Sequence, residues 1–149
     1  MAMNQEAKRL GMDSTTYTNP HGLSEKDHLS TAADLAKLAF TALGNPMFSD
    51  YVSTRERGVV VRGSSGYERN VIWKNTNQLL AIQGYEGIKT GTTSKAGACL
   101  ASVCFREDRR LLLVVLGSSS SSSRYTDSRN LYRWAWLNLM GVNDEMGDH

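Results

Sequence analysis

The spacing of apolar residues predicts two helices in the first third of the chain. Residues 4–10 (NQEAKRL) read as the last turns of a helix that Gly11 ends. A second helix is expected to begin at Ser30 or Thr31, each a good N-cap, and to end before Gly44. The apolar face of this helix consists of Leu35, Leu38, Ala39 and Ala42.

The middle of the chain changes to short strands joined by turns. Residues 57–63 (RGVVVRG) and 67–73 (YERNVIW) flank a Ser-Ser-Gly turn and predict a β-hairpin. Two longer apolar segments, 98–107 (ACLASVCFRE) and 109–117 (RRLLLVVLG), predict a second, buried hairpin. The last predicted element is a helix over residues 124–140, in which one face carries Tyr125, Tyr132, Trp136 and Leu139.

This order of elements favours a single domain of the α+β class. Helices are followed by a hairpin, by three strands (the segment around Lys89 and the second hairpin) and by the last helix. No internal repeat is visible. Sequential hairpins between helices predict an antiparallel sheet with helices packed on it. The length of 149 residues fits one domain and is too short for two ordinary ones.

The composition is that of a globular protein, with 40% hydrophobic and 21% charged residues. The net charge of +2 is small and the basic residues are scattered, which argues against nucleic-acid binding. The longest apolar run, residues 111–116, has the length of a strand, so no membrane span is expected. The N-terminal MAMNQEAKRL does not resemble a signal peptide, and the cellular location of the chain is therefore left unknown.

The cysteines and histidines give no indication of a metal or another cofactor. Cys99 and Cys104 are five positions apart in a predicted strand, so their side chains point to opposite faces and cannot easily form a disulfide with each other. Neither they nor the three histidines show metal-ligand spacing. We expect no metal and no cofactor, and we interpret both cysteines as small apolar packing residues.

The segment around Lys89 points to ligand binding. Lys89, Thr90 and Gly91 are followed by another threonine, Thr92. A lysine in a strand holds its ammonium group beside an open sheet edge, and Gly91 lets a ligand backbone approach closely. The threonine hydroxyls are donors for a carboxylate. This set predicts a site for an anionic peptide laid along the strand edge. The simpler alternative is an exposed strand end with a solvated lysine.

The sequence around this K-T-G triplet favours the binding site. The segments MNQEAKRLGM, NPHGLS, STAADLAKL and NTNQLL precede YEGIKTGTTSKAG. From about Asn4 to Leu139 they closely resemble the D-alanyl-D-alanine carboxypeptidase family of low-molecular-mass penicillin-binding proteins, in the serine β-lactamase-like superfamily. The resemblance implies a partial penicillin-binding-protein or β-lactamase-like transpeptidase fold. It also implies a periplasmic or otherwise extracytoplasmic hydrolase that binds a peptidoglycan stem peptide or a β-lactam-like ligand.

The resemblance also implies roles for individual residues. Lys89 matches the lysine that faces the reactive serine and orients the substrate. The hydroxyls of Thr90 and Thr92 match the groups that bind the terminal carboxylate of the substrate. The backbone N–H of Thr92, beside Gly91, matches one donor of the oxyanion hole. Arg124 matches an arginine that commonly lies near the same carboxylate.

One half of the family's catalytic machinery is not found in the sequence. The nucleophile of the family is the serine of an S-x-x-K motif, which precedes an S-x-N motif. None of the lysines has a serine three positions before it, so S-x-x-K is absent. The single S-x-N, Ser128-Arg129-Asn130, falls in the predicted last helix, after K-T-G, and is a chance match. Residues 1–149 are therefore expected to form one partial domain, the C-terminal half, without its nucleophile.

Two other functions remain open at this stage. The chain is expected to be a hydrolase of another type (for esters, β-lactams or glycosides) if Lys89 is paired with a hydroxyl of Thr92, Ser94 or the run Ser118–Ser123. Alternatively, it is a non-catalytic binding or assembly module. Under every interpretation, a sheet without its outer strands has an open edge and an uncovered apolar surface. We therefore expect a homo-oligomer formed through that edge or that surface.

Overall fold

The computed structural model describes residues 1–139, and it contains the predicted helices and hairpins in the predicted order, together with two short helices that were not predicted. The helices are α1 (Ala2–Arg9), α2 (Ala32–Leu43), α3 (Pro46–Ser53) and α4 (Ser123–Leu139), with a short 3₁₀ helix η1 (Gln78–Ala81). The strands are β1 (Glu56–Arg62), β2 (Glu68–Lys74), β3 (Tyr85–Thr93), β4 (Gly97–Arg106) and β5 (Arg109–Ser118). The predicted domain and last helix extend past residue 139, and that part lies outside the described residues.

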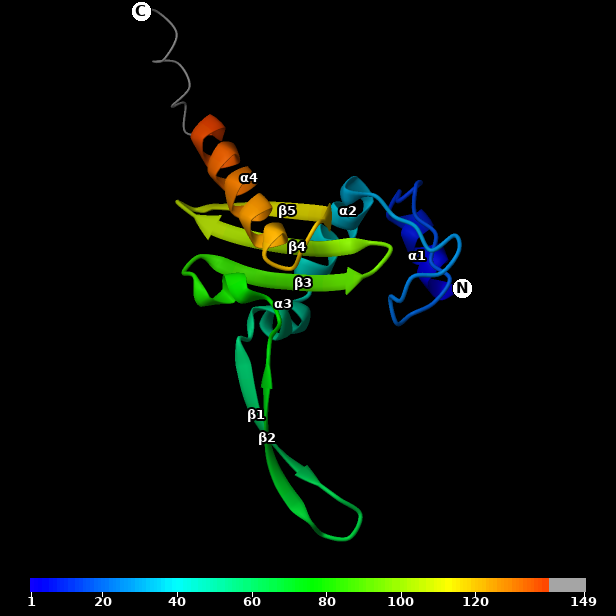
Figure 1. The fold of residues 1–149 in the computed structure, drawn as a ribbon, viewed down its shortest axis with the longest axis vertical. Coiled ribbons are helices and arrows are strands. Elements are labelled where there is room, and N and C mark those ends of the chain that lie inside the picture. The colour runs from blue at the N-terminus through cyan, green and yellow to red at the C-terminus, as the bar shows by residue number, and fades with distance from the viewer. Residues whose placement is uncertain (140–149) are drawn as a thin grey trace, which may run out of the picture.

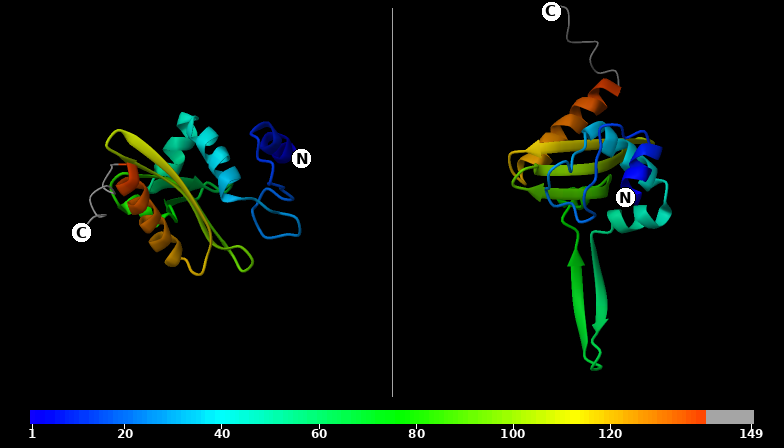
Figure 2. Two further views of the ribbon diagram at one scale, coloured as in Figure 1. Left: turned by 90° about the horizontal axis from the view of Figure 1, so that it is seen from above. Right: turned by 90° about the vertical axis from the view of Figure 1, so that its right-hand side faces the viewer.

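The strands form two separate antiparallel sheets (Figure 1). β3, β4 and β5 form a three-stranded sheet in that order, so β3 and β5 are its edges. Helix α4 lies on one face of this sheet, and α2 lies on the other (Figure 2). The predicted α+β class, an antiparallel sheet with helices packed on it, is confirmed. No helix within residues 1–139 has the length and apolar character needed to cross a membrane.

The helix caps explain where α2 begins and why α3 follows it. The hydroxyl of Thr31 accepts a hydrogen bond of 3.1 Å from the N–H of Asp34, so Thr31 rather than Ser30 is the N-cap of α2. The Asn45 side chain accepts from the first N–H groups of α3, and Pro46 occupies its first turn. Helix α3 is not among the elements predicted from the sequence.

The face of the sheet toward α4 holds a closed aromatic core. Tyr132 and Trp136 pack against Cys104 of β4, and all three are buried. The Tyr132 hydroxyl shares a 2.9 Å hydrogen bond with Ser102, which is fully buried. Tyr125, Tyr132 and Trp136 thus lie on the predicted face of α4. Leu139 does not follow them: it is 47% exposed, because α4 extends past the sheet at that end (Figure 1).

The face toward α2 is only partly covered. Ala39, Ile88 and Val103 form a small buried cluster. Leu35 and Leu38, on the same apolar face of α2, are only half-buried and line a cavity. The two cysteines lie on opposite faces, as predicted: Cys99 lines this cavity, whereas Cys104 packs under α4.

Asp34 fixes the loop before α2 to the helix. Its carboxylate is buried and accepts hydrogen bonds from the Thr15 hydroxyl (2.8 Å) and the Ser14 N–H (2.9 Å), and its other oxygen lies 3.2 Å from the Lys37 ammonium. Burial raises the pKa of the Asp34 carboxyl, but the hydrogen bonds and the ammonium favour the charged form more strongly. The net result is a pKa below its usual value of 3.8.

We expect Asp34 to make the stability of the fold depend on acid pH. Because its folded-state pKa is lowered, the carboxylate stabilises the fold above about pH 4, and this contribution is lost as pH falls through the folded-state pKa. The free energies of unfolding of the wild type and Asp34→Asn in urea should therefore differ at pH 7, and the difference should be smaller at pH 3. An equal difference at both pH values would contradict this role for the charge.

Candidate ligand site at the edge of β3

The K-T-G residues lie on an edge strand. β3 pairs only with β4 among the described residues, so no strand covers its other side, although α3 and η1 contact parts of it. The register places Lys89 opposite Ala101 and Thr92 opposite Ala98. Because side chains alternate along a strand, Lys89 points to the α2 face, whereas Thr90 and Thr92 point to the α4 face. A ligand beside β3 can therefore be contacted from both faces of the sheet.

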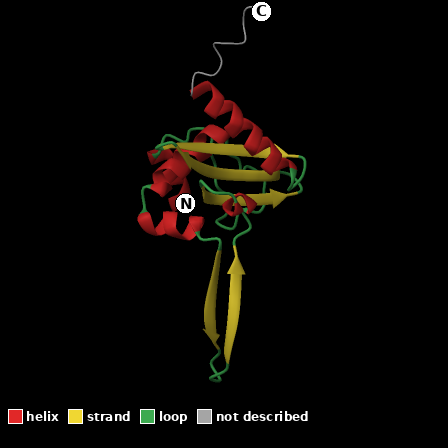
Figure 3. Ribbon diagram, turned by 90° about the vertical axis from the view of Figure 1, so that its left-hand side faces the viewer, coloured by secondary structure: helices red, strands yellow, loops and turns green. Residues whose placement is uncertain are grey.

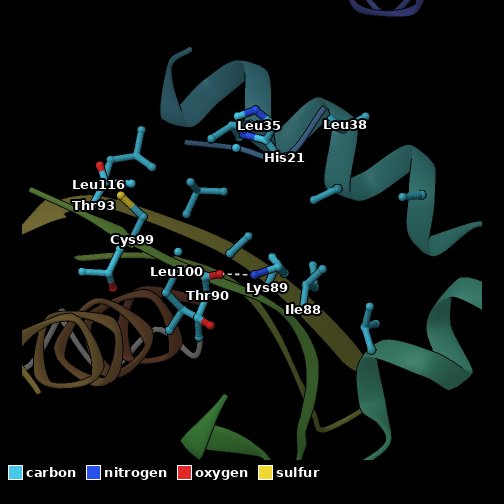
Figure 4. Close-up of a pocket in the computed structure, with 18 of the residues that line it drawn as sticks. His21, Leu35, Leu38, Ile88, Lys89, Thr90, Thr93, Cys99, Leu100 and Leu116 are labelled. Carbon is cyan, nitrogen blue, oxygen red and sulfur yellow. Dashed lines mark hydrogen bonds between the residues drawn. The ribbon is translucent and has the colours of Figure 1, made fainter. Parts of the chain in front are cut away.

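Lys89 projects into the cavity between the sheet and α2 (Figure 4). The cavity has a volume of about 710 Å³. Its lining is mostly apolar and comes from α2, α3, the three strands of the sheet and the loop around His21, including Leu38, Ala42 and Leu116. The Lys89 ammonium donates to the carbonyl oxygen of Thr90. Lys89 thus places a positive charge at the rim of an apolar space.

Arg124, in the first turn of α4, lies on the other side of the strand. It is only 7% exposed, and its Nη1 donates to the Thr92 hydroxyl (3.0 Å) and to the Gly91 carbonyl oxygen (3.4 Å). Its Nη2 lies 3.3 Å from the Tyr125 hydroxyl, and its buried Nε has no partner within the described residues. None of these partners is a carboxylate. A buried positive charge without an anion is unfavourable, so the site is suited to an anionic ligand.

The two threonines differ in what they offer a ligand. Thr90 is 7% exposed, and its hydroxyl shares a 2.7 Å hydrogen bond with the hydroxyl of Thr76. Thr92 is exposed and lies beside the Arg124 guanidinium. The structure therefore brings Arg124 and Thr92 together and leaves the Thr90 hydroxyl with a partner inside the protein. The oxyanion role of the Thr92 N–H stays a prediction.

Two residues that support the site were not predicted from the sequence. The Tyr125 hydroxyl donates to the Thr76 carbonyl oxygen (2.9 Å) and accepts from Arg124. Thr76 in turn contacts Thr90. The sequence pattern places Tyr125 on the apolar face of its helix and Thr76 in a motif, and it gives neither residue a role in the site. The one feature of the sequence that indicates a role for Tyr125 in the site is its position next to Arg124.

Within residues 1–139, the Lys89 ammonium forms no hydrogen bond to a hydroxyl group. Thr92 points to the opposite face of the strand and is bound by Arg124. Ser118 donates to Asp127, and the other hydrogen-bonded serines of the run contact one another. The hydrogen bond of the Lys89 ammonium within the described part of the chain goes to a backbone carbonyl. The alternative hydrolase therefore receives no support from this geometry.

Comparison with known proteins identifies the family of this chain. The family model for D-alanyl-D-alanine carboxypeptidase matches residues 1–120. D-alanyl-D-alanine carboxypeptidase DacC of Escherichia coli K12 is 33% identical over 135 residues, which cover 90% of this chain and 32% of DacC. DacF of Bacillus subtilis 168 is 32% identical, over 82% of this chain and 31% of DacF. The chain thus spans about a third of the length of these relatives.

Solved structures show the same fold. The Streptomyces K15 DD-transpeptidase has a TM-score of 0.86 and 31% identity, over 91% of this chain and 52% of that one. DacD of Francisella tularensis has a TM-score of 0.78 and 27% identity, over 91% of this chain and 44% of that one. The fold is therefore that of the penicillin-binding proteins and DD-peptidases. Since the family model covers most of the sequence, the chain belongs to the D-alanyl-D-alanine carboxypeptidase family.

Proposed function

We propose that this chain is the substrate-binding part of a serine-type D-alanyl-D-alanine carboxypeptidase. In this proposal it holds the carboxyl end of a peptidoglycan stem peptide, or a β-lactam-like ligand, at the open edge of β3. The observation that carries the proposal is the buried guanidinium of Arg124, which contacts Thr92 and no carboxylate within the described residues. The carboxylate of the peptide supplies the missing anion.

The geometry supports one mode of binding. An extended peptide pairs with the free side of β3 through its backbone, as in other complexes formed by strand addition. Its terminal carboxylate lies on the α4 side, beside Arg124 and Thr92. Lys89 contacts the peptide from the α2 side, because adjacent residues of the strand point to opposite faces. Gly91 has open space where a side chain would lie, so the ligand backbone can approach.

The proposal assigns no nucleophile to residues 1–149. The sequence lacks S-x-x-K, so an acyl-serine intermediate requires a serine from outside these residues. We therefore infer that residues 1–149 form a partial domain. The chain alone is expected to bind substrate without hydrolysing it, because loss of the nucleophile leaves only binding and electrostatic stabilisation.

We expect the wild type to bind a peptide ending in D-alanyl-D-alanine and Lys89→Ala to bind it about tenfold more weakly, since one charged contact is lost. Isothermal titration with the free-carboxylate peptide measures this. Lys95→Ala is the control, because Lys95 is exposed in the turn after β3. A fluorescent penicillin should leave no covalent label on the chain. Labelling, or equal affinity of all three proteins, would refute the proposal.

We also propose that the chain self-associates through the open side of β5 and the cavity beside it. β5 contains an uninterrupted apolar run, residues 111–116, and no strand pairs with its outer side within residues 1–139. Long apolar strand edges readily pair with other chains. Leu116 is 40% exposed, lies on this strand and lines the cavity. A charge at this position should therefore disfavour association.

Sedimentation velocity tests this self-association. The wild type is expected to sediment as an oligomer, and Leu116→Glu is expected to shift it toward the monomer. Leu137→Glu is the matched control, because Leu137 is 39% exposed but belongs to α4 and does not line the cavity. A wild type that is monomeric at all concentrations would contradict the proposal, as would equal shifts for both variants.

A further inference from the structure

The β1–β2 hairpin extends from the body of the molecule as an arm (Figures 1 and 3). The two strands pair from Glu56–Lys74 at the base to Arg62–Glu68 near the tip. Apart from Val59 and Val71, which are half-buried, every side chain of both strands is exposed. A two-stranded hairpin alone is only marginally stable in water, so an exposed arm of this kind is suited to a binding role.

The two faces of the arm carry different charges. On one face, Glu68 forms an ion pair with Arg62 (2.6 Å), and Glu56 lies opposite Lys74 in the register. Positive and negative charges are balanced there. The other face, which we call the arginine face, consists of Arg57, Val59, Val61, Arg69, Val71 and Trp73. It contains two arginines and no acidic residue.

The arginine face has the chemistry of a site for a carboxylate-bearing chain. Arg57 lies opposite Trp73, and Arg69 lies opposite Val61, four residues further along β1. At the rise of a strand, this separates the two arginines by about 13 Å. Neither has an ion-pair partner among the residues that the structure describes. Guanidinium groups bind carboxylates in a bidentate manner, and Trp73, 61% exposed, offers a flat apolar surface between ligand and strand.

The base of the arm is fixed to the ligand site. The Asn75 side chain donates to the carbonyl oxygens of Val52 (3.3 Å) and Thr54 (3.2 Å), which closes the base. The next residue, Thr76, contacts Thr90 of the K-T-G strand. The arm also leaves the body on the side of the sheet where β3 is the edge (Figure 1). A long ligand that reaches the edge of β3 is therefore close to the base of the arm.

We propose that the arginine face is a second binding site, for an anionic glycopeptide polymer whose peptide ends occupy the edge of β3. Arg57 and Arg69 bind carboxylates of the polymer, and Trp73 packs against its apolar surface. The polymer is named from the proposed function, whereas the site itself rests on the charges and exposure of the arm. The arm thereby selects polymeric over short soluble ligands.

Co-sedimentation with insoluble peptidoglycan sacculi tests this site. The double variant Arg57→Ala/Arg69→Ala is expected to bind roughly tenfold more weakly than the wild type, because two charge-assisted contacts are lost. The control Arg62→Ala/Lys74→Ala removes the same net charge from the opposite face and should bind within about twofold of the wild type. Binding of the wild type should also weaken as the salt concentration rises.

Two further measurements distinguish the arginine face from the site at the edge of β3 and from a membrane contact. The free D-alanyl-D-alanine peptide should bind the Arg57→Ala/Arg69→Ala variant as it binds the wild type, because the edge of β3 is intact. If this peptide does not bind the wild type, the proposed function fails. The arginine face is still tested in that case, by the binding of the two double variants to sacculi. The proposal of a second site would be overturned if both double variants lost the same affinity for sacculi, or if neither lost any. So would arginine-dependent binding to phosphatidylglycerol vesicles without binding to sacculi, which would indicate a membrane contact.

Discussion

Replacing Trp136 by alanine is expected to lower the free energy of unfolding by about 3–5 kcal/mol, the usual loss for a large buried aromatic side chain. Trp136 is 6% exposed and packs with Tyr132 against Cys104, where α4 covers the sheet. The substitution leaves a cavity in the one face of the sheet that is closed. Urea unfolding followed by circular dichroism measures this change.

Trp134 provides a matched control on the same helix. It is 65% exposed, because two residues along a helix point in very different directions. Trp134→Ala should therefore change the free energy of unfolding by less than about 0.5 kcal/mol, as is usual for exposed positions. Similar losses for both variants would mean that α4 does not pack on the sheet as described.

Much of the fold could be predicted because its signals are local. The caps of α2, the strands of both hairpins and the buried face of α4 follow from side-chain periodicity and turn residues. The sequence did not predict that the first hairpin forms a separate sheet and projects away from the three-stranded one. Val59, Val61 and Val71 look like core residues in the sequence, and whether a hairpin packs on the body depends on tertiary contacts. Leu139 was misplaced for the same reason, since periodicity does not say where the sheet ends.

The candidate site was predicted less completely than the fold. The K-T-G pattern placed Lys89 and Thr92 on a strand edge, which the structure bears out. It did not indicate that Thr90 is turned into the protein toward Thr76, because that contact joins residues 14 positions apart. The contact between Arg124 and Thr92 joins residues 32 positions apart, and only the family resemblance pointed to it.

Replacing Arg124 by methionine is expected to affect binding far more than folding. Methionine is unbranched and keeps much of the apolar volume, but it cannot bind an anion. We expect the affinity for the free-carboxylate D-alanyl-D-alanine peptide to fall about 100-fold or more, equivalent to at least about 3 kcal/mol. The free energy of unfolding without peptide should change little or increase, because a buried charge without a carboxylate partner is removed.

The opposite result would show that Arg124 is structural. In that case Arg124→Met would unfold at lower urea concentration, and the remaining folded protein would bind the peptide normally. Arg129→Met is the control, since Arg129 is an exposed arginine of the same helix and should change neither quantity. The peptide with a C-terminal amide provides a second control. It should bind the wild type about as weakly as the acid binds Arg124→Met, because both combinations lack the same charge-assisted contact.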